Sequence, residues 1–382
     1  MRRWSIRHAA GRAGVAPSTW MRIERGELRT DRYMISDLAA ALECSIADLT
    51  GQPIPSSDRS LTAAHARVIA LWRVLVEVAP DEPPRRPVLA IPALSARMDL
   101  IDSRRAACDF AGVAQLLPDL LLDLHAATRD RRRGRAARLL FLRATYSAAS
   151  TLRSLGYLAE ATIAAERCRQ VAEQIDQAVP LAVADWARAH VALSSGSFGR
   201  ALTLVSRAAD DLERNLEAPT APEVLGMLHL STAMAVLADH RTDDAFAHIN
   251  EAAQLAARTG ETTSWNMCFG PSNVALWRMG LEVDTGQPAA AIETANNVRP
   301  ATIPSVDRQS AYYLDFGRAL ADIPGRDRDA VRMLLQAERV APQRIRSSVS
   351  ARDTARFLLD RSRRAEGGSE LLGLCERLGV HA

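Results

Sequence analysis

The sequence predicts an all-α protein in which a small N-terminal helical domain precedes a solenoid of paired helices. From Ala93 onward, Ala, Leu, Arg and Glu dominate and no strand pattern occurs, so helical runs alternate with short turns. One pattern of small residues also recurs five times in this region, which is typical of stacked helical pairs. A chain of 382 residues, 48% of them hydrophobic, is long enough for two or three packed domains.

Residues 14–27 predict the turn and the second helix of a helix-turn-helix. Gly14 suits the left-handed residue that ends one short helix, Pro17 fits the first position of the next helix, and Gly26 follows that helix. Trp20 and Ile23 lie three residues apart and therefore share one buried face. The other face carries short polar or cationic side chains of the kind that contact bases and phosphates: Ser18, Thr19, Met21, Arg22 and Arg25.

This segment and its neighbours resemble the Xre/Cro-type helix-turn-helix of bacterial regulators. The resemblance covers residues 4–51, with a first helix over 5–15, a turn at 16–17 and closing helices over 33–51. Residues 22–26 reproduce the Arg-Ile-Glu-Arg-Gly run that recurs in that family.

The resemblance implies that the domain binds double-stranded DNA. Base contacts are expected from Ser18, Thr19 and Met21, with Pro17 shaping the approach of the helix. Phosphate contacts are expected from Arg22 and Arg25. In the family, the arginine and the glutamate of this run can also pair with each other and stiffen the fold.

Two departures from the family pattern affect this expectation. Ala16 stands where the family has a capping Ser, which costs about 1 kcal/mol unless Pro17 offsets it. The family also begins with a full helix before the one at Ser5, and only residues 1–4 precede it here, so the first helix is missing. Three explanations stay open: a misassigned chain start, another segment that fills the gap, or a domain too weakened to bind an operator.

Positive charge gathers on the N-terminal segment. All 48 basic residues of the chain are arginines, and each can therefore make bidentate contacts. Residues 1–32 hold eight of them against three acidic residues, although the whole chain has a formal charge of only +3. The excess lies where neutralisation of DNA phosphates would require it.

Other function classes find little support in the sequence. The chain has no GxSxG, HExxH, P-loop or GxGxxG motif, so we expect neither an enzyme nor a cofactor. The five cysteines form no CxxC pair and the histidine spacings match no zinc pattern, so we expect no metal. The chain has no run of eighteen apolar residues and no signal-peptide core, which predicts a cytoplasmic protein without a membrane partner.

A linker and a helix follow the first domain. Residues 51–60 combine one Gly, two Pro and three Ser, and residues 61–79 then carry an apolar stripe formed by Val68, Leu71, Trp72 and Leu75. This helix could pair with its copy in a dimer or cover the face left open by the missing first helix, but we expect it to connect two domains. The predicted boundaries are 1–52 for the helix-turn-helix domain, 53–92 for the linker and connecting helix, 93–350 for the repeats and 351–382 for C-terminal capping helices.

In the repeated pattern, a small residue is followed five places later by Ala and seven places after that by a similar small residue. The instances start 40, 44, 46 and 39 residues apart. They are Gly156/Ala161/Cys168, Gly196/Ala201/Ala208, His240/Ala245/Ala252, Gly286/Ala291/Val298 and Gly325/Ala330/Ala337.

These positions resemble tetratricopeptide repeats, in which Gly ends the first helix and Ala lets two helices approach closely. The spacing exceeds the 34 residues of that family, which longer helices or loops would explain. A generic α-solenoid is the alternative, because helical hairpins produce similar patterns. Both predict a curved stack with a concave side, and residues 105–127 form one more irregular pair at its front.

Alignment of the repeats predicts which side chains face that concave side. An apolar middle with a few hydrogen-bonding groups suits a small hydrophobic molecule or an extended peptide. The alternative is that these side chains only pack between helices. The predicted ligand-facing residues are Arg143, Tyr146, Ser150, Arg153, Trp186, His190, Met227, Leu230, Met234, Asn273, Leu276, Trp277, Tyr312 and Asp315.

Residues 264–277 depart most from the repeat pattern. They contain two Trp, Phe269, Pro271 and Asn273 in one turn-rich stretch, so we expect a ligand-facing element there. The stretch also resembles a segment of actinobacterial regulators that join an Xre-type domain to tetratricopeptide-like repeats. In peptide-pheromone receptors of that layout, inner-face Asn side chains hold the peptide backbone, a role that the resemblance implies for Asn273. Helix capping is the alternative for this residue.

These observations predict a DNA-binding transcriptional regulator whose helical repeats sense a ligand and mediate dimerisation. One helix-turn-helix buries little surface, so we expect a homodimer on a pseudo-palindromic operator with half-sites about 10 bp apart or a multiple of that. The alternative is a helical-repeat scaffold that binds a protein partner and keeps a degenerate helix-turn-helix.

Overall fold

The computed structural model describes residues 4–54, 58–78, 84, 86–130, 132–303, 305–362 and 369–380. Within these residues every regular element is helical, which confirms the predicted all-α class. None of the helices in the described ranges is long and apolar enough to cross a membrane.

The chain begins with four short helices, which we call the N-terminal domain. They are α1 (Ile6–Arg12), α2 (Pro17–Glu24), α3 (Arg32–Leu42) and α4 (Ile46–Thr50). The turn between α1 and α2 holds Gly14 at φ 68°, and Gly26 follows α2 at φ 67°, as the sequence predicts. Trp20 is buried among small residues of α1 and α3, so the predicted inner face of α2 is confirmed.

Side-chain caps define the other ends of this domain. The Asp31 carboxylate accepts hydrogen bonds from the backbone N–H groups of Tyr33 and Met34 at the start of α3. Ser45 and Asp48 form a capping box at the start of α4. Ala16, at the N-cap of α2, makes no side-chain hydrogen bond, which agrees with the predicted departure from the family pattern.

Three longer helices follow. They are α5 (Arg59–Glu77), α6 (Ile91–Ala106) and α7 (Phe110–Ala127). The predicted connecting helix therefore exists, but α5 packs along α7 and α9 and is part of the repeat core. Val68, Leu71 and Leu75 are buried there, whereas Trp72 is 41% exposed and does not belong to their stripe.

Five antiparallel helical pairs form the body of the solenoid. The helices are α8 (Gly134–Ser154) and α9 (Leu158–Ile175), α10 (Ala178–Ser194) and α11 (Phe198–Glu213), α12 (Ala221–Leu237) and α13 (Thr242–Thr259), α14 (Pro271–Asp284) and α15 (Pro288–Asn296), and α16 (Val306–Ala321) and α17 (Asp327–Val340). Two short 3₁₀ turns, η1 (Ser264–Asn266) and η2 (Pro300–Thr302), lie between pairs. The chain ends with α18 (Pro342–Arg346), α19 (Val349–Ser362) and α20 (Ser369–Arg377).

The repeated small residues mark the turn within each of the five pairs. Their first members all have positive φ, from 57° at His240 to 88° at Gly156, and each lies directly between the two helices of a pair. The alanines that follow are buried where the two helices touch. Only Val298 falls outside its predicted helix, because α15 ends at Asn296.

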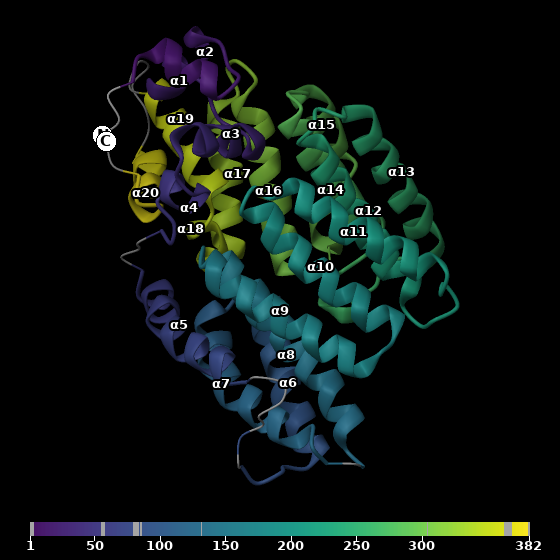
Figure 1. The fold of residues 1–382 in the computed structure, drawn as a ribbon. Helices are drawn as coiled ribbons and strands as arrows, with labels where there is room; N and C mark the ends of the chain where they lie inside the picture. The colour runs from purple at the N-terminus through teal and green to yellow at the C-terminus, as the bar shows by residue number, and fades with distance from the viewer. Residues whose placement is uncertain are drawn as a thin grey trace.

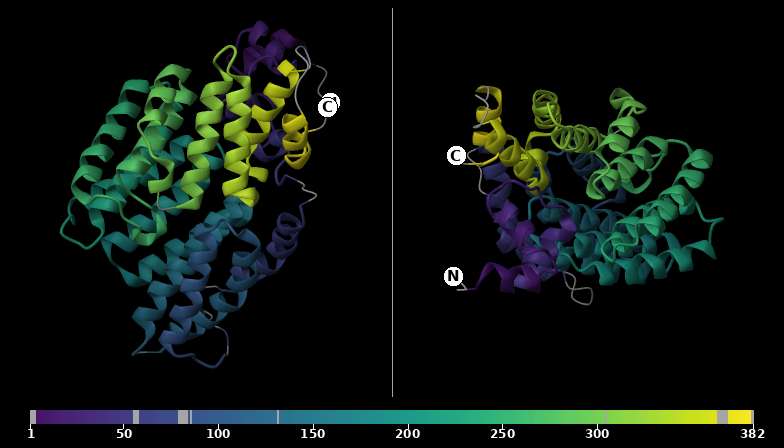
Figure 2. Two further views of the ribbon diagram at one scale, coloured as in Figure 1. Left: turned by 180° about the vertical axis from the view of Figure 1, so that it is seen from behind. Right: turned by 90° about the horizontal axis from the view of Figure 1, so that it is seen from above.

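The pairs curve around a centre, and the N-terminal domain and the C-terminal helices lie at the open side of the curve. Figure 1 shows α3 and α4 near α19 and α20, and the view from above in Figure 2 shows that α1 projects away from those helices. Gly26 approaches Asp360 of α19, and Thr30 donates a hydrogen bond to Asp353 at 2.9 Å. The N-terminal domain is therefore docked on the C-terminal helices and is not a separate lobe.

The N-terminal domain also contacts the middle of the solenoid. The hydroxyl of Tyr33 donates a hydrogen bond to the carbonyl of Met234 at 2.9 Å, and its ring packs against Phe198 at 5.1 Å. Gly196, between α10 and α11, faces Ser36 and Ile46 so closely that an added Cβ would lie 2.6 Å from the Ser36 hydroxyl. The solenoid thus closes around this domain.

Gly226 fixes how closely the loop before α14 packs on α12. Phe269, which is fully buried, lies over Gly226, and an added Cβ would come within 2.1 Å of the phenyl ring. Glycine is favourable at this position of α12 because any larger side chain would occupy the space of the Phe269 ring.

We predict that Gly226→Ala lowers the free energy of unfolding by about 1–3 kcal/mol, since the new methyl group must displace a buried ring. Gly199→Ala is the matched control, because nothing lies within 4 Å of its added Cβ. It should be neutral or stabilise by up to about 1 kcal/mol. Chemical denaturation measures both changes, and equal effects of the two substitutions would contradict the packing described here.

Candidate functional site

A cavity of about 440 Å³ lies at the centre of the curve. The inner helices α8, α10, α12 and α14 line it mainly with their C-terminal halves, and α16 lines it along most of its length. The N-terminal domain closes the cavity with side chains from α3, α4 and the adjoining loops, and the segment that joins α18 to α19 completes it. The residues that the N-terminal domain contributes are Thr30, Arg32, Ile35, Ile46, Thr50 and Gln52.

The structure brings most of the predicted ligand-facing residues to this cavity. The aromatic and apolar ones among them lie on α8, α10, α12 and α14, in the order that the repeat alignment predicts. The predicted residues that line the cavity are Tyr146, Ser150, Arg153, Trp186, His190, Met234, Leu276, Trp277 and Asp315.

Five other predicted residues lie outside the lining. Arg143 forms ion pairs with Asp99 and Asp102 of α6, which hold it away from the centre. Met227 and Leu230 are fully buried between helices. They lie one to two turns before Met234 on α12, where the helices pack too closely to leave a cavity.

Asn273 and Tyr312 are also enclosed by their neighbours. The Asn273 amide nitrogen lies 3.4 Å from the Met227 sulfur, and its side-chain oxygen is buried without a partner among the described residues. It neither faces the cavity nor caps its helix, because Gly270 is the N-cap residue. The Tyr312 hydroxyl donates a hydrogen bond to the Ala295 carbonyl at 3.2 Å.

Residues 264–277 contribute to the cavity at four positions. The side chains that line it are Asn266, Cys268, Leu276 and Trp277, whereas Phe269 packs against Gly226. Trp265 lies on η1 with φ 53°, and its indole N–H donates a hydrogen bond to Thr220. The stretch is therefore partly a cavity element and partly a packing element.

Aromatic rings form a continuous surface on one side of the cavity. Tyr146 and Trp186 have ring centroids 5.8 Å apart, Trp186 and His190 are 4.0 Å apart, and His190 and Trp277 are 5.8 Å apart. These separations are those of interacting aromatic pairs. The surface suits a flat apolar group.

His190 is held in one tautomer by its neighbours. Its Nε2 lies 3.1 Å from the Ser231 hydroxyl, and that hydroxyl already donates its proton to the Met227 carbonyl. Nε2 must therefore carry the proton, and Nδ1 is left as an acceptor. Burial and the nearby charges of Arg153 and Arg308 hold the pKa of His190 well below its usual value, so the ring is neutral at neutral pH.

The cavity is more charged than the repeat alignment predicts. Six arginines and four aspartates line it. On the side of the N-terminal domain, Asp284 accepts from Arg32 at 2.9 Å and from Arg318 at 2.7 Å, and Arg318 also pairs with Asp315 at 2.8 Å. Burial alone would raise the pKa of Asp284, but the two guanidinium groups hold it below its usual value.

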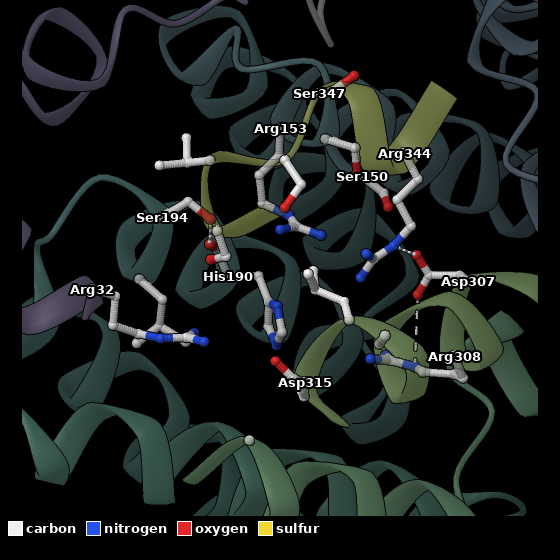
Figure 3. Close-up of a pocket in the computed structure, with 18 of the residues that line it drawn as sticks. Arg32, Ser150, Arg153, His190, Ser194, Asp307, Arg308, Asp315, Arg344 and Ser347 are labelled. Carbon is white, nitrogen blue, oxygen red and sulfur yellow. Dashed lines mark hydrogen bonds and ion pairs between the residues drawn. The ribbon is translucent and has the colours of Figure 1, made fainter. Parts of the chain in front are cut away.

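A second charged cluster lies at the start of α16. Figure 3 shows Asp307 between Arg344 and Arg308, and the distance from Asp307 to Arg308 is 3.8 Å. The two arginines outweigh burial and hold the pKa of Asp307 well below its usual range. Arg153 lies nearby on α8 and lines the same side of the cavity.

Sequence reasoning missed most of these charged groups. Arg32 lies in the N-terminal domain, and Asp307, Arg308 and Arg344 lie at the starts of helices, outside the aligned inner positions. Their spacing carries no signal, because the tertiary fold alone brings them together. The charged residues around the cavity come from several helices, so the pattern within a single repeat does not predict them.

The predicted DNA-contacting residues lie on the outer face of α2. Pro17, Ser18, Arg22 and Arg25 are exposed, and Thr19 and Met21 are partly exposed. Neither Arg22 nor Arg25 forms an ion pair with another residue in the described ranges, so the internal pairing that the family resemblance allows is not seen for them. This face of α2 is open to a partner.

Comparisons with known proteins assign the chain to no family. No protein-family model matches it, and no curated protein is similar enough to match. The function must therefore be inferred from the geometry of α2 and of the central cavity.

The neutral state of His190 has a consequence for the pH dependence of stability. Because its pKa is lowered in the folded chain, the unfolded chain binds a proton near pH 6.5 that the folded chain does not. Stability should therefore fall as the pH drops below that value. We predict that, when the pH is lowered from about 7.5 to about 5.5, the melting temperature of His190→Gln falls less than that of the wild type.

The melting temperature at each pH measures this difference. His8→Gln replaces an exposed histidine of α1 and serves as the control, which should keep the loss seen in the wild type. An equal loss in His190→Gln and in the wild type would show that this ring does not carry the effect.

Proposed function

We propose that this protein is a DNA-binding transcriptional regulator whose helical repeats sense a small molecule in the central cavity. The observation that carries the proposal is that the N-terminal domain contributes both the exposed outer face of α2 and part of the lining of the central cavity. On the outer face of α2, Arg22 and Arg25 are exposed and form no ion pair with any residue that the structure describes, while α3 and α4 of the same domain line the cavity through Arg32, Ile35 and Ile46. The role is one of binding and not of catalysis.

The chemistry of the outer face of α2 supports DNA as the partner. Ser18 and Thr19 can donate to or accept from base edges in a major groove, and the two guanidinium groups can neutralise phosphates. The face also lies at the edge of the molecule, as Figure 1 shows for α1 and α2. A double helix could therefore approach it without displacing the solenoid.

The shared cavity supports control by a ligand. An occupant would touch the N-terminal domain and the repeats at once, so it would favour the arrangement of the two in which it binds best. The cavity volume of about 440 Å³ suits a small molecule better than an extended peptide.

The outer face of α5 supports the expected homodimer. Ile69, Trp72 and Val76 are 60%, 41% and 49% exposed, and their spacing places them on one side of the helix. Such an exposed apolar stripe is typical of an interaction surface. Because α5 follows the N-terminal domain directly, pairing of two α5 helices would fix the distance between two α2 helices.

We predict that Arg22→Ala and Arg25→Ala each weaken DNA binding about 5- to 100-fold without a change in melting temperature, since each removes a phosphate contact. Fluorescence anisotropy with DNA from upstream of the protein's own coding region, over a range of salt concentrations, measures the effect. Arg207→Ala, on the exposed surface of α11, removes the same charge and should leave affinity unchanged. If the wild type shows no salt-dependent, sequence-preferring binding, the regulator is contradicted and the scaffold is favoured.

We also predict that the double substitution Ile69→Glu and Trp72→Glu converts a dimer to a monomer, because charges would be buried in the apolar contact. Light scattering coupled to size-exclusion chromatography measures the mass. Leu372→Glu changes another exposed apolar residue, on α20, and should leave the dimer intact. A wild-type protein that is monomeric, or a double variant that remains dimeric, would contradict the role of this stripe.

A further inference from the structure

Arg153 is the least compensated charge in the cavity. It lies in the last turn of α8, and Figure 3 shows its guanidinium group pointing into the cavity between His190 and Arg344. Among the described residues it makes no hydrogen bond and no ion pair. The free carbonyl groups at the end of α8 offer it only a partial negative charge.

Positive charge accumulates around Arg153. Arg105, Arg308 and Arg344 line the same cavity, and Arg308 and Arg344 both pair with the carboxylate of Asp307. Burial lowers the pKa of Arg153, and repulsion by Arg344 and Arg308 opposes the partial relief that Asp307 gives.

The other two arginines lie on aromatic rings. The Arg105 guanidinium lies 5.0 Å from the centre of the Tyr146 ring and donates one hydrogen bond to the Asn266 carbonyl at 3.2 Å, whereas its buried Nε has no hydrogen-bond partner within the described ranges. The Arg308 guanidinium lies 5.9 Å from the centre of the Trp277 ring. Guanidinium groups only donate hydrogen bonds, so any further partner of these arginines must be a hydrogen-bond acceptor.

A cluster of this kind favours the binding of negative charge from outside the chain. A charge that is withdrawn from bulk water without a partner is unfavourable, and a bidentate acceptor relieves it best. Carboxylates and phosphates match the planar fork of an arginine. The neighbouring Ser150 hydroxyl can donate one further hydrogen bond to such a group.

Aromatic surface adjoins the cationic cluster. The His190 ring contacts the rings of both Trp186 and Trp277, and all three line the cavity that Arg153 also lines. Their faces suit the flat or apolar body of a ligand, whereas the arginines suit its head group. The aromatic surface and the arginine cluster together suit one amphipathic ligand.

We propose that the central cavity binds a small organic anion, with an aromatic or apolar body against Trp186, His190 and Trp277 and a carboxylate or phosphate group paired with Arg153 and Arg308. This inference rests on the proposed ligand-sensing function and narrows its ligand class. It differs from the expectation of a small hydrophobic molecule or an extended peptide in requiring an anionic head group, which Arg153 of α8 and Arg308 of α16 would bind together.

Two fluorescent probes of nearly the same shape test the inference in the full chain without DNA. One is 8-anilinonaphthalene-1-sulfonate, which carries one negative charge, and the other is N-phenyl-1-naphthylamine, which lacks it. We expect the anion to bind one site per chain at least tenfold more tightly than the neutral probe, since charged hydrogen bonds contribute a factor of about ten or more. Arg153→Gln should remove this preference, and Arg153→Lys should keep part of it.

Controls separate the site from the fold and from other surfaces. Arg207→Gln removes a charge from the surface of α11 and should not change either affinity. Far-ultraviolet circular dichroism and the melting temperature establish that each variant is folded. Equal binding of the two probes by the wild type, or an unchanged preference in folded Arg153→Gln, would overturn the inference.

Competition then identifies the head group. 1-Naphthoate and 1-naphthyl phosphate carry the same body with different acidic groups, and the inference requires that at least one of them displaces the anionic probe. The stronger competitor distinguishes a carboxylate from a phosphate ligand, and displacement by neither would contradict the site. Because no DNA is present, a protein that binds the anion but no operator would refute the proposed function while leaving this inference intact.

Discussion

The buried carboxylate of Asp284 is the contact on which the arrangement of the molecule depends. It lies at the end of α14 and receives Arg32 from the N-terminal domain and Arg318 from α16, at 2.9 and 2.7 Å. The side chain of Asp284 is only 3% exposed and that of Arg318 is 7% exposed, so water cannot readily replace either partner of that pair, whereas Arg32 keeps contact with solvent. Removal of one partner from such a buried pair costs about 3–5 kcal/mol, because it leaves charge without compensation. The carboxylate thereby joins the N-terminal domain to two neighbouring inner helices of the solenoid, α14 and α16.

The N-terminal domain covers part of the concave surface of the solenoid and turns it into a deeper, partly open site. Without α3 and α4, the inner helices would present an open groove. With them, the groove becomes a cavity that Arg32 and Ile35 help to line. Any occupant must therefore contact the domain that carries the exposed face of α2, and its binding energy depends on where that domain lies. This is the physical basis on which a ligand could change the presentation of Arg22 and Arg25.

Local chemistry explains which parts of this arrangement the sequence predicts. Gly156, Gly196 and Gly286 are required by backbone angles within a few residues of themselves, so their spacing reveals the helical pairs. The same reasoning locates Trp186 and His190, because they lie four residues apart on the inward face of one inner helix, α10. It fails for Met227 and Asn273, since the close approach of Phe269 to Gly226 removes the cavity from their part of α12 and α14. It fails also for Arg32 and Asp307, whose neighbours lie far away in sequence.

The central claim is that Asp284 holds the N-terminal domain against the repeats and so closes the cavity. Hydrogen–deuterium exchange of the full chain, compared between wild type and Asp284→Asn, tests it most directly. Asp244→Asn, which breaks the exposed ion pair with Arg241, is the matched control. The amides of α1–α4 should exchange faster in Asp284→Asn alone, while those of α8–α11 keep their protection. Unchanged protection of α1–α4 in Asp284→Asn would contradict the claim.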